Sequence, residues 1–504
     1  MNPFPPLPQF ASPTGEKIPE YHDAMLEVRL RTDVGPLGGE VALGGPMMLT
    51  RSAAATSTGL GMLLSFERSG LIRRAVSLAE DTVAAAGGET PLLARIAAAA
   101  RPRQPDDPNA GVTLIELYRD QDTQLLETEL RRDPTVESVS KVPIRFLLAK
   151  KKAAPRKNSS PKKAASSRKA AGGATIAAAP PTGALWNLAK IRWAQARQHA
   201  GFKDATNIKV AVLDTGIDLA HPDRPVNIAG YEFTHPTTAN ASSNRDIIGH
   251  GTHVAGTIAA NLNNTVGISG ICNCAIYALK IFDDGPDYSA SAGYFVYFVD
   301  PAMYQRALAR CRTLAMNVVN LSIGGYGAPS ANESLLFNKL LQSGTTIVAA
   351  MGNDNSSQPS YPAAIPGVIA VGATSINDVR ASFSNFGGHI SICAPGQGIW
   401  STLPTYPGNT GYWPKNTFPV KPDLTRPMSR DTDYASWDGT SMATPHVTGA
   451  VALLLAANGA MSPAAVKQRL ESRARKVPAM QGQNFSQEYG YGRLDLFRLL
   501  WGGP

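Results

Sequence analysis

The chain has 504 residues, of which 43% are hydrophobic and 17% are charged. At roughly 150 residues per domain this length allows about three folding units, and the composition excludes both a polar disordered chain and an integral membrane protein. The formal net charge of +9 raises the question of a nucleic-acid or acidic-membrane partner, which depends on where the charge lies.

The first 24 residues are rich in proline, and we expect them to be disordered. They lack the basic start and apolar helix of a signal peptide, so a cytoplasmic or non-classically exported protein is expected. The most apolar early stretch, residues 41–66, is interrupted by Arg51 and by several Gly, Ser and Thr residues. No membrane span is therefore expected.

Residues 25–148 carry both strand and helix patterns, and we expect an α+β region here. Alternating apolar residues predict strands at residues 24–32, 112–118 and 136–148, and helical spacing predicts helices at residues 71–86 and 122–132. Asp122 is placed to cap the second helix.

Residues 149–182 form a segment of Ala, Lys, Pro, Ser and Gly with nine Lys or Arg residues and no acidic residue. These nine residues account for the whole net charge, so the rest of the chain is neutral. The segment has too little apolar surface to fold, and we expect an extended linker. No aromatic side chain is interleaved for base stacking, which disfavours a nucleic-acid partner.

Residues 183–504 alternate short β-branched strands with helices rich in small residues. This pattern predicts an α/β fold, mainly a parallel sheet with helices on both faces. Chemistry gathers at the carboxyl ends of the strands in such sheets.

Four polar residues occupy strand ends or helix starts in this region: Asp214, His250, Asn353 and Ser441. A serine becomes nucleophilic when an imidazole takes its proton, and a carboxylate orients the imidazole. Backbone N–H groups at a helix start and an Asn amide can stabilise an oxyanion. Each residue alone could be a turn or a cap, but the four together indicate acyl transfer.

Five sequence blocks of this region resemble, in order, those of the subtilisin-like serine peptidases, or subtilases: VAVLDTGIDLAHPD, GHGTHVAGTIAA, VVNLSIGG, AAMGND and GTSMATPHVTGA. The resemblance runs from about Trp186 to residue 500 and implies a peptidase domain at residues 183–504. It implies a serine endopeptidase that acts on polypeptides, with Asp214, His250 and Ser441 as the triad and Asn353 as the oxyanion donor. No cofactor is required for this chemistry.

The resemblance also implies where a substrate binds. Residues 321–325 would pair with it as an added strand through Ser322, Ile323, Gly324 and Gly325. Gly324, Ala350 and Gly352 would form the walls of the pocket for the residue before the scissile bond, with Asp354 at its rim and Ser360 near its floor. We expect bulky apolar residues there, with some tolerance of Lys or Arg. Pro362 matches a family position with a cis bond.

Many subtilases carry an N-terminal prodomain, and residues 112–148 look like the end of one. This resemblance implies a self-inhibited precursor in which the N-terminal region acts as an intramolecular inhibitor. Its C-terminal tail would lie along the substrate strand, so we expect self-cleavage between Phe146 and Thr182.

The loop at residues 261–270 resembles one that wraps Ca²⁺ in some subtilases. The implied ligands are Asp223, Leu262, Asn264, Val266 and Ile268, all through oxygen atoms, which suits a structural Ca²⁺ ion.

Three other functions are alternatives to a serine endopeptidase. HGTH, with His253 after His250, lacks the glutamate and the spacing of a zinc peptidase motif. A serine esterase of the α/β-hydrolase type needs a second glycine where Ala443 stands. A catalytically idle groove-binding protein remains a rival.

His446 is expected to be packed in the interior and not to take part in catalysis. The four cysteines, Cys272, Cys274, Cys311 and Cys393, are expected to be small buried residues.

Overall fold

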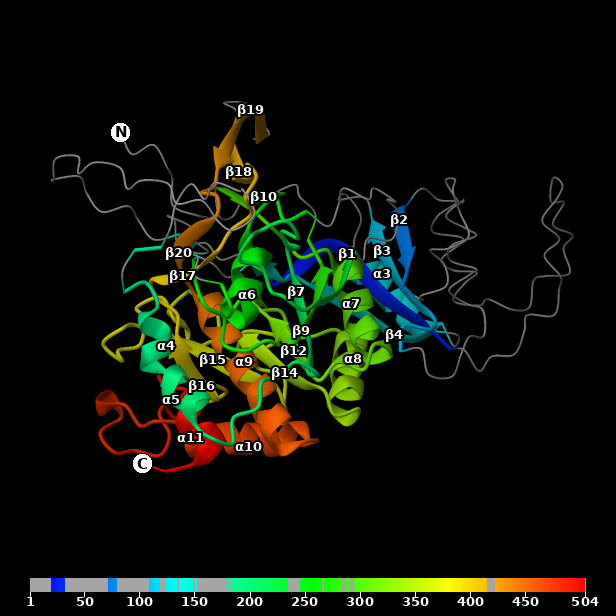
Figure 1. Cartoon of the computed structure of the whole chain (residues 1–504). Helices are drawn as coiled ribbons and strands as arrows, with labels where there is room; N and C mark the ends of the chain where they lie inside the picture. The colour runs from blue at the N-terminus through cyan, green and yellow to red at the C-terminus, as the bar shows by residue number, and fades with distance from the viewer. Residues whose placement is uncertain are drawn as a thin grey trace, which may run out of the picture.

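The computed structural model describes most of the chain (Figure 1). The described residues are 20–31, 71–78, 108–117, 123–133, 136–147, 150–151, 180–181, 183–233, 245–264, 267–282, 287–289, 294–414 and 422–503. The expectations for residues 1–19, for the cap at Asp122 and for most of the basic linker lie outside them.

A parallel sheet organises the C-terminal part of the chain, with seven strands among the described residues. In spatial order these are β16 (Ile392–Pro395), β15 (Ile369–Thr374), β14 (Thr346–Ala350), β12 (Val318–Leu321), β7 (Lys209–Asp214), β9 (Ala275–Lys280) and β8 (Ile228–Phe233). The neighbouring strands pair in parallel throughout. The central strands are almost wholly buried, which explains their continuous runs of β-branched and small residues.

Helices cover both faces of this sheet, which confirms the predicted α/β fold. Val210 and Val212 pack into one hydrophobic core, while Ala211 and Leu213 pack into the other. The first core contains α5 (Trp193–Gln198), α6 (His250–Ala259), α9 (Thr440–Asn458), α10 (Pro463–Arg473) and α11 (Leu496–Trp501). The second contains α7 (Pro301–Thr313) and α8 (Ala331–Gln342). Helix α9 is apolar enough to cross a membrane, but 89% of that stretch is buried inside the structure.

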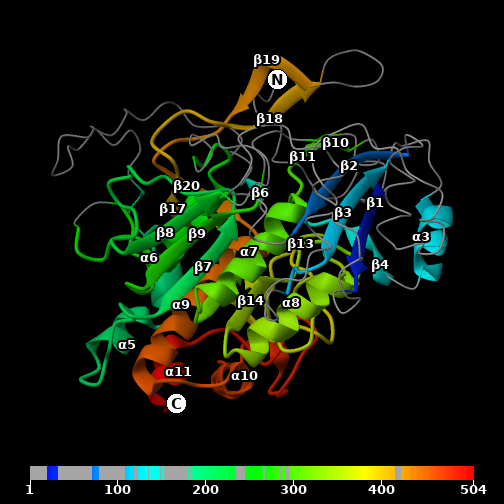
Figure 2. The ribbon, with the colours of Figure 1, turned by 90° about the vertical axis from the view of Figure 1, so that its right-hand side faces the viewer.

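The N-terminal region is a mixed α/β unit with a four-stranded antiparallel sheet in the order β2-β3-β1-β4. Its elements are β1 (Tyr21–Leu30), β2 (Ile72–Ser77), β3 (Val112–Leu117), α3 (Thr123–Arg132) and β4 (Val136–Pro143). The sheet lies beside α7 and α8 of the C-terminal part (Figures 1 and 2).

The helix predicted at residues 71–86 is wrong for its described part, because residues 72–77 form strand β2. A register shift between Ile72 and Arg74 breaks the alternation of this strand. Ile72 and Ala75, three residues apart, therefore contribute to the same core, whereas Val76 faces another. This bulge produces the three-residue spacing that suggested a helix.

The remaining elements are short. They are β5 (Phe146–Leu147), β6 (Lys150–Lys151), α4 (Trp186–Lys190), β10 (Asp287–Ser289), β11 (Tyr294–Val296), β13 (Ile323–Gly324), β17 (Ile399–Thr402), β18 (Asn409–Pro414), β19 (Pro422–Ser429), β20 (Tyr434–Asp438) and a 3₁₀ turn at Pro478–Met480. The hairpin of β18 and β19 projects from the body of the molecule (Figures 1 and 2).

Candidate active site

Asp214 and His250 are joined by a short hydrogen bond. Asp214 is the last residue of β7 and His250 the first of α6, and the distance from His250 Nδ1 to Asp214 Oδ1 is 2.7 Å. Both side chains are buried. Because a carboxylate only accepts, Nδ1 carries the proton, which leaves Nε2 as the acceptor in the neutral ring. Nε2 has no hydrogen-bond partner among the described residues.

Ser441 lies in the first turn of α9, beside the predicted substrate strand. Its Oγ donates to the backbone carbonyl of Ser322 at 3.0 Å, and the Ser322 hydroxyl donates to the carbonyl of Ser441 at 3.1 Å. Helices α6 and α9 pack against each other, and the His250 ring stacks on Trp437, four residues before Ser441, with 6.2 Å between the ring centroids. The hydroxyl can exchange its carbonyl partner for an imidazole once a substrate enters.

Asn353 follows β14 and faces the start of α9. Its Oδ1 accepts hydrogen bonds from the backbone N–H of Thr440 at 2.9 Å and from the Thr440 hydroxyl at 3.0 Å. A backbone N–H can only donate, so this contact settles which end of the amide is oxygen. This contact places the Asn353 amide group at the start of α9, one residue before Ser441.

A further buried carboxylate, Asp246, holds the start of α6, and sequence reasoning missed it. It accepts four hydrogen bonds, from Thr215 Oγ1, Gly249 N, Thr252 N and Thr252 Oγ1, at 2.6 to 2.8 Å. Thr215 follows Asp214, and its hydroxyl also accepts from the N–H of Gly251 at 2.8 Å. Asp246 therefore ties the strand of Asp214 to the helix of His250.

The predicted substrate-binding residues lie around β13. Ile323 and Gly324 form this strand, and Gly325 forms a bridge to Tyr361. Ala350 and Ser360 are buried. Gly352 has φ of +104°, and a Cβ there would meet Asn385 Nδ2 at 2.3 Å, so a side chain is excluded. Asp354 accepts a hydrogen bond from the Tyr326 hydroxyl. The cis bond before Pro362 is confirmed.

The end of the N-terminal region crosses this site. β5 pairs antiparallel with β13, with Leu147 opposite Ile323 and Phe146 opposite Gly324. On its other side, the N–H of Val299 donates to the carbonyl of Arg145 at 2.9 Å. β6 then pairs with β20, with Lys150 opposite Asp438.

Among the predicted calcium ligands, the structure brings Asn264 and Ile268 to the buried carboxylate of Asp223. Asp223 accepts from Asn264 Nδ2 at 2.7 Å and from the backbone N–H of Ile268 at 2.8 Å. Burial raises the pKa of the Asp223 carboxyl to about 7. Asn264 Oδ1 is buried without a partner among the described residues, and Val266 lies outside them. A cation here would need carbonyl oxygens, because the described residues contain no group of three His, Cys, Asp or Glu side chains suited to a metal.

His253, His446 and the four cysteines are packed inside the protein. The His253 ring stacks on Trp437 with 5.0 Å between ring centroids, and burial lowers its pKa to about 3. His446 contacts Asn187 and the carbonyl of Met442, and burial lowers its pKa to about 4. All four cysteines are buried and none forms a disulfide, as expected for small packed residues.

Comparison with known proteins agrees with this geometry. The model of the subtilase family matches residues 205–492. Subtilisin amylosacchariticus of Bacillus subtilis subsp. amylosacchariticus is 37% identical over 281 residues, which are 55% of this chain and 62% of the relative. Subtilisin DY of Bacillus licheniformis is 36% identical over 304 residues, or 59% of this chain and 92% of the relative.

Among solved structures, the fold resembles that of fervidolysin from Fervidobacterium pennivorans, described as a keratinolytic enzyme related to subtilisin. The TM-score is 0.61 at 23% identity, over 97% of this chain and 62% of that chain. The chain therefore spans less than two thirds of the length of fervidolysin and of subtilisin amylosacchariticus. The extent of the family match and the subtilisin identities show that this chain belongs to the subtilase family.

Proposed function

We propose that the protein is a serine endopeptidase in which Asp214, His250 and Ser441 act as a triad. The observation that carries the proposal is the buried Asp214–His250 hydrogen bond of 2.7 Å, which leaves Nε2 as an acceptor. Ser441 Oγ attacks the carbonyl carbon of a peptide bond, and its proton passes to Nε2. Asn353 stabilises the oxyanion. His250 then protonates the leaving amine, and water hydrolyses the acyl-enzyme.

Labelling with a fluorophosphonate tests this proposal. We expect stoichiometric modification of Ser441, together with hydrolysis of a test peptide, and loss of both in Ser441→Ala. Ser472→Ala, on the exposed face of α10, is the matched control and should behave as the wild type. A folded wild-type protein that takes up no label would instead support the catalytically idle groove-binding protein.

The N-terminal region acts as an intramolecular inhibitor that the enzyme cuts from itself. Support comes from the register of β5 on β13: one step beyond Leu147 and Ile323, residue 148 would face Ser322. The register of β6 sets Lys150 opposite Asp438, three residues before Ser441. From these two registers we expect the cleavage between residues 148 and 149, inside the interval from Phe146 to Thr182.

Mass spectrometry of the purified chain tests the position of this cleavage. The wild type should give a new N-terminus at Ala149, while Ser441→Ala should remain at full length. Leu148→Asp should slow the cleavage, because a charged side chain would enter an apolar pocket. An intact wild-type chain in a preparation that hydrolyses a test peptide would contradict self-processing.

The pocket for the residue before the scissile bond accepts bulky apolar side chains, because the residues that would form its walls, Gly324, Ala350 and Gly352, have small side chains or none. Asp354 at its rim adds a weak, solvent-screened attraction for Lys or Arg. A peptide library should favour Leu, Phe and Met, and Asp354→Asn should reduce the cleavage after Lys and Arg. A profile dominated by Gly, Asp or Pro would be incompatible with this pocket.

A structural Ca²⁺ ion binds at Asp223, Leu262, Asn264, Val266 and Ile268. The buried carboxylate of Asp223 and the unpartnered Oδ1 of Asn264 support this, since oxygen ligands of this mixture suit the ion. The melting temperature should be higher in millimolar Ca²⁺ than in EGTA, and Asp223→Asn should remove the difference. Equal melting temperatures of the wild type in both conditions would exclude the site.

A further inference from the structure

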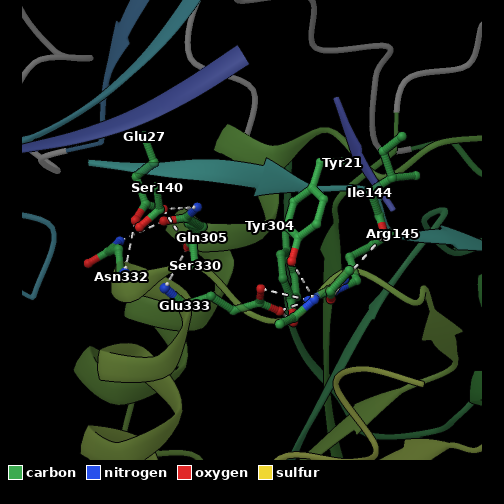
Figure 3. Close-up of polar contacts among 12 residues, drawn as sticks. Tyr21, Glu27, Ser140, Ile144, Arg145, Tyr304, Gln305, Ser330, Asn332 and Glu333 are labelled. Carbon is green, nitrogen blue, oxygen red and sulfur yellow. Dashed lines mark hydrogen bonds and ion pairs between the residues drawn. The ribbon is translucent and has the colours of Figure 1, made fainter. Parts of the chain in front are cut away.

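Arg145 lies at the end of the N-terminal region, immediately before β5, and its side chain is buried in the C-terminal part of the molecule. Only 2% of this side chain is exposed. The guanidinium forms two hydrogen bonds with Glu333, at 3.2 Å from Nε to Oε1 and 2.9 Å from Nη2 to Oε2 (Figure 3). Nη1 donates to the carbonyl of Gly327 at 2.9 Å. This bidentate, charge-assisted geometry is specific for a guanidinium.

The acceptors of this guanidinium outside its own segment belong to the proposed peptidase domain and would remain after the N-terminal region leaves. Glu333 lies in the first turn of α8, where the helix dipole favours a carboxylate. Its Oε1 also accepts from the Tyr304 hydroxyl at 3.1 Å, and its backbone N–H donates to the N-capping hydroxyl of Ser330. The Glu333 side chain is 2% exposed. The carboxylate is thus oriented by its own domain toward the position that Arg145 fills.

Arg145 also occupies a defined place relative to the active site. The chain at Arg145 is hydrogen-bonded to Val299 on one side, and β5 pairs with β13 immediately after it. With cleavage between residues 148 and 149, as proposed above, Arg145 is the fourth residue before the scissile bond. Any polypeptide bound in the same register would place its own fourth residue against Glu333.

We propose that Glu333 forms a subsite for a cationic side chain, preferably arginine, at the fourth residue before the scissile bond of polypeptide substrates. This inference rests on the proposed function and adds a substrate class to it. An apolar side chain at that position would leave the buried Glu333 carboxylate with the Tyr304 hydroxyl but without a positive charge beside it, which is costly. Arginine satisfies both carboxylate oxygens, whereas lysine, a point charge with no planar fork, would satisfy them less well.

Peptides that differ only at the fourth residue before the bond test the proposal on the self-processed wild-type enzyme. With Leu before the bond in each peptide, we expect kcat/KM for Arg to exceed that for Leu by about tenfold or more, with Lys between them and Glu lowest. Glu333→Leu should reverse the order of Arg and Leu, and Glu333→Gln should reduce the ratio. Glu232→Gln, which removes an acidic residue on the distant strand β8, should leave the ratio unchanged.

The wild-type series alone decides the question, even if Glu333→Leu does not fold. Equal kcat/KM values for the Arg and Leu peptides would overturn this inference while leaving the proposed endopeptidase intact, and would make the Arg145–Glu333 pair a docking contact only. Absence of hydrolysis of every peptide, with no labelling of Ser441, would overturn the proposed function and this inference together.

Discussion

Glu27 on β1 offers a direct test of how the N-terminal region is held on the rest of the protein. Its carboxylate is 2% exposed and accepts hydrogen bonds from Ser330 Oγ at 2.6 Å, Gln305 Nε2 at 2.8 Å and Asn332 N at 2.9 Å (Figure 3). Glu27→Ala would leave these three donors buried without an acceptor. Each unsatisfied donor costs about 1 to 3 kcal/mol, but the variant no longer has to bury a carboxylate. We therefore expect a net loss of about 3 kcal/mol, or about 100-fold in the dissociation constant.

The assay follows the release of the N-terminal region after self-cleavage. Glu27→Ala should shorten the lag before a test peptide is hydrolysed, and the cleaved N-terminal fragment should no longer co-elute with the peptidase domain in size-exclusion chromatography. Glu137→Ala, an exposed residue on β4 of the same sheet, is the matched control. Wild-type lag and co-elution in Glu27→Ala would refute the reasoning.

The same contact predicts a pH dependence. The pKa of Glu27 is raised above its ordinary value of 4.5, chiefly because the carboxyl group is buried. The hydrogen bonds from Ser330, Asn332 and Gln305 lower the pKa, but they do not cancel the effect of burial. The nearby negative charge of Glu333 raises the pKa further. The docked state therefore binds a proton more tightly than the released state does. The proton-linked part of the contribution of Glu27 to docking is complete below pH 4.5 and is lost as the pH rises through the raised pKa, while the three hydrogen bonds to the carboxylate remain. Release should accelerate with pH above 4.5, and Glu27→Gln should flatten this dependence.

Three further substitutions test the site and the interface. Asp246→Asn replaces one of the two acceptor oxygens at the start of α6 with a donor, so two of the four hydrogen bonds lose their acceptor. It should lower kcat, and it should lower the free energy of unfolding by about 2 to 4 kcal/mol in urea titrations. An unchanged kcat would show that this cluster does not position His250. Gly251→Ala would bring a Cβ to 2.1 Å from the carbonyl oxygen of Gly216. The start of α6 would have to move and would displace His250, so labelling of Ser441 by the fluorophosphonate should slow strongly. Labelling at the wild-type rate would contradict this displacement. Gly327→Ala would bring a Cβ to 2.1 Å from the carbonyl of Glu20 and should shorten the activation lag, whereas a wild-type lag would show that this interface adapts.

The sequence predicted best those features that depend on local patterns. The strands of the parallel sheet are buried on both faces and so consist of continuous apolar runs, which makes β7 and β14 easy to recognise. The ends of these strands then point to Asp214 and Asn353 as candidate site residues. In the structure, Asp214 contacts His250 and Asn353 contacts Thr440. β2 was mistaken for a helix because a bulge is a property of its pairing with β3, which its own sequence does not encode.

The contacts that sequence reasoning missed join residues far apart in the chain. Asp246 resembles an ordinary turn aspartate until Thr215, 31 residues earlier, is seen to donate to it. Arg145 and Glu333 are 188 residues apart, and neither belongs to a motif. Their partnership follows from the way that β5 lies on β13, while the N-terminal sheet also contacts the start of α8 through Glu27. The docking contact and the proposed arginine subsite therefore share one helix N-terminus, so a substitution at Glu333 should affect both inhibition and specificity, whereas one at Glu27 should affect inhibition alone.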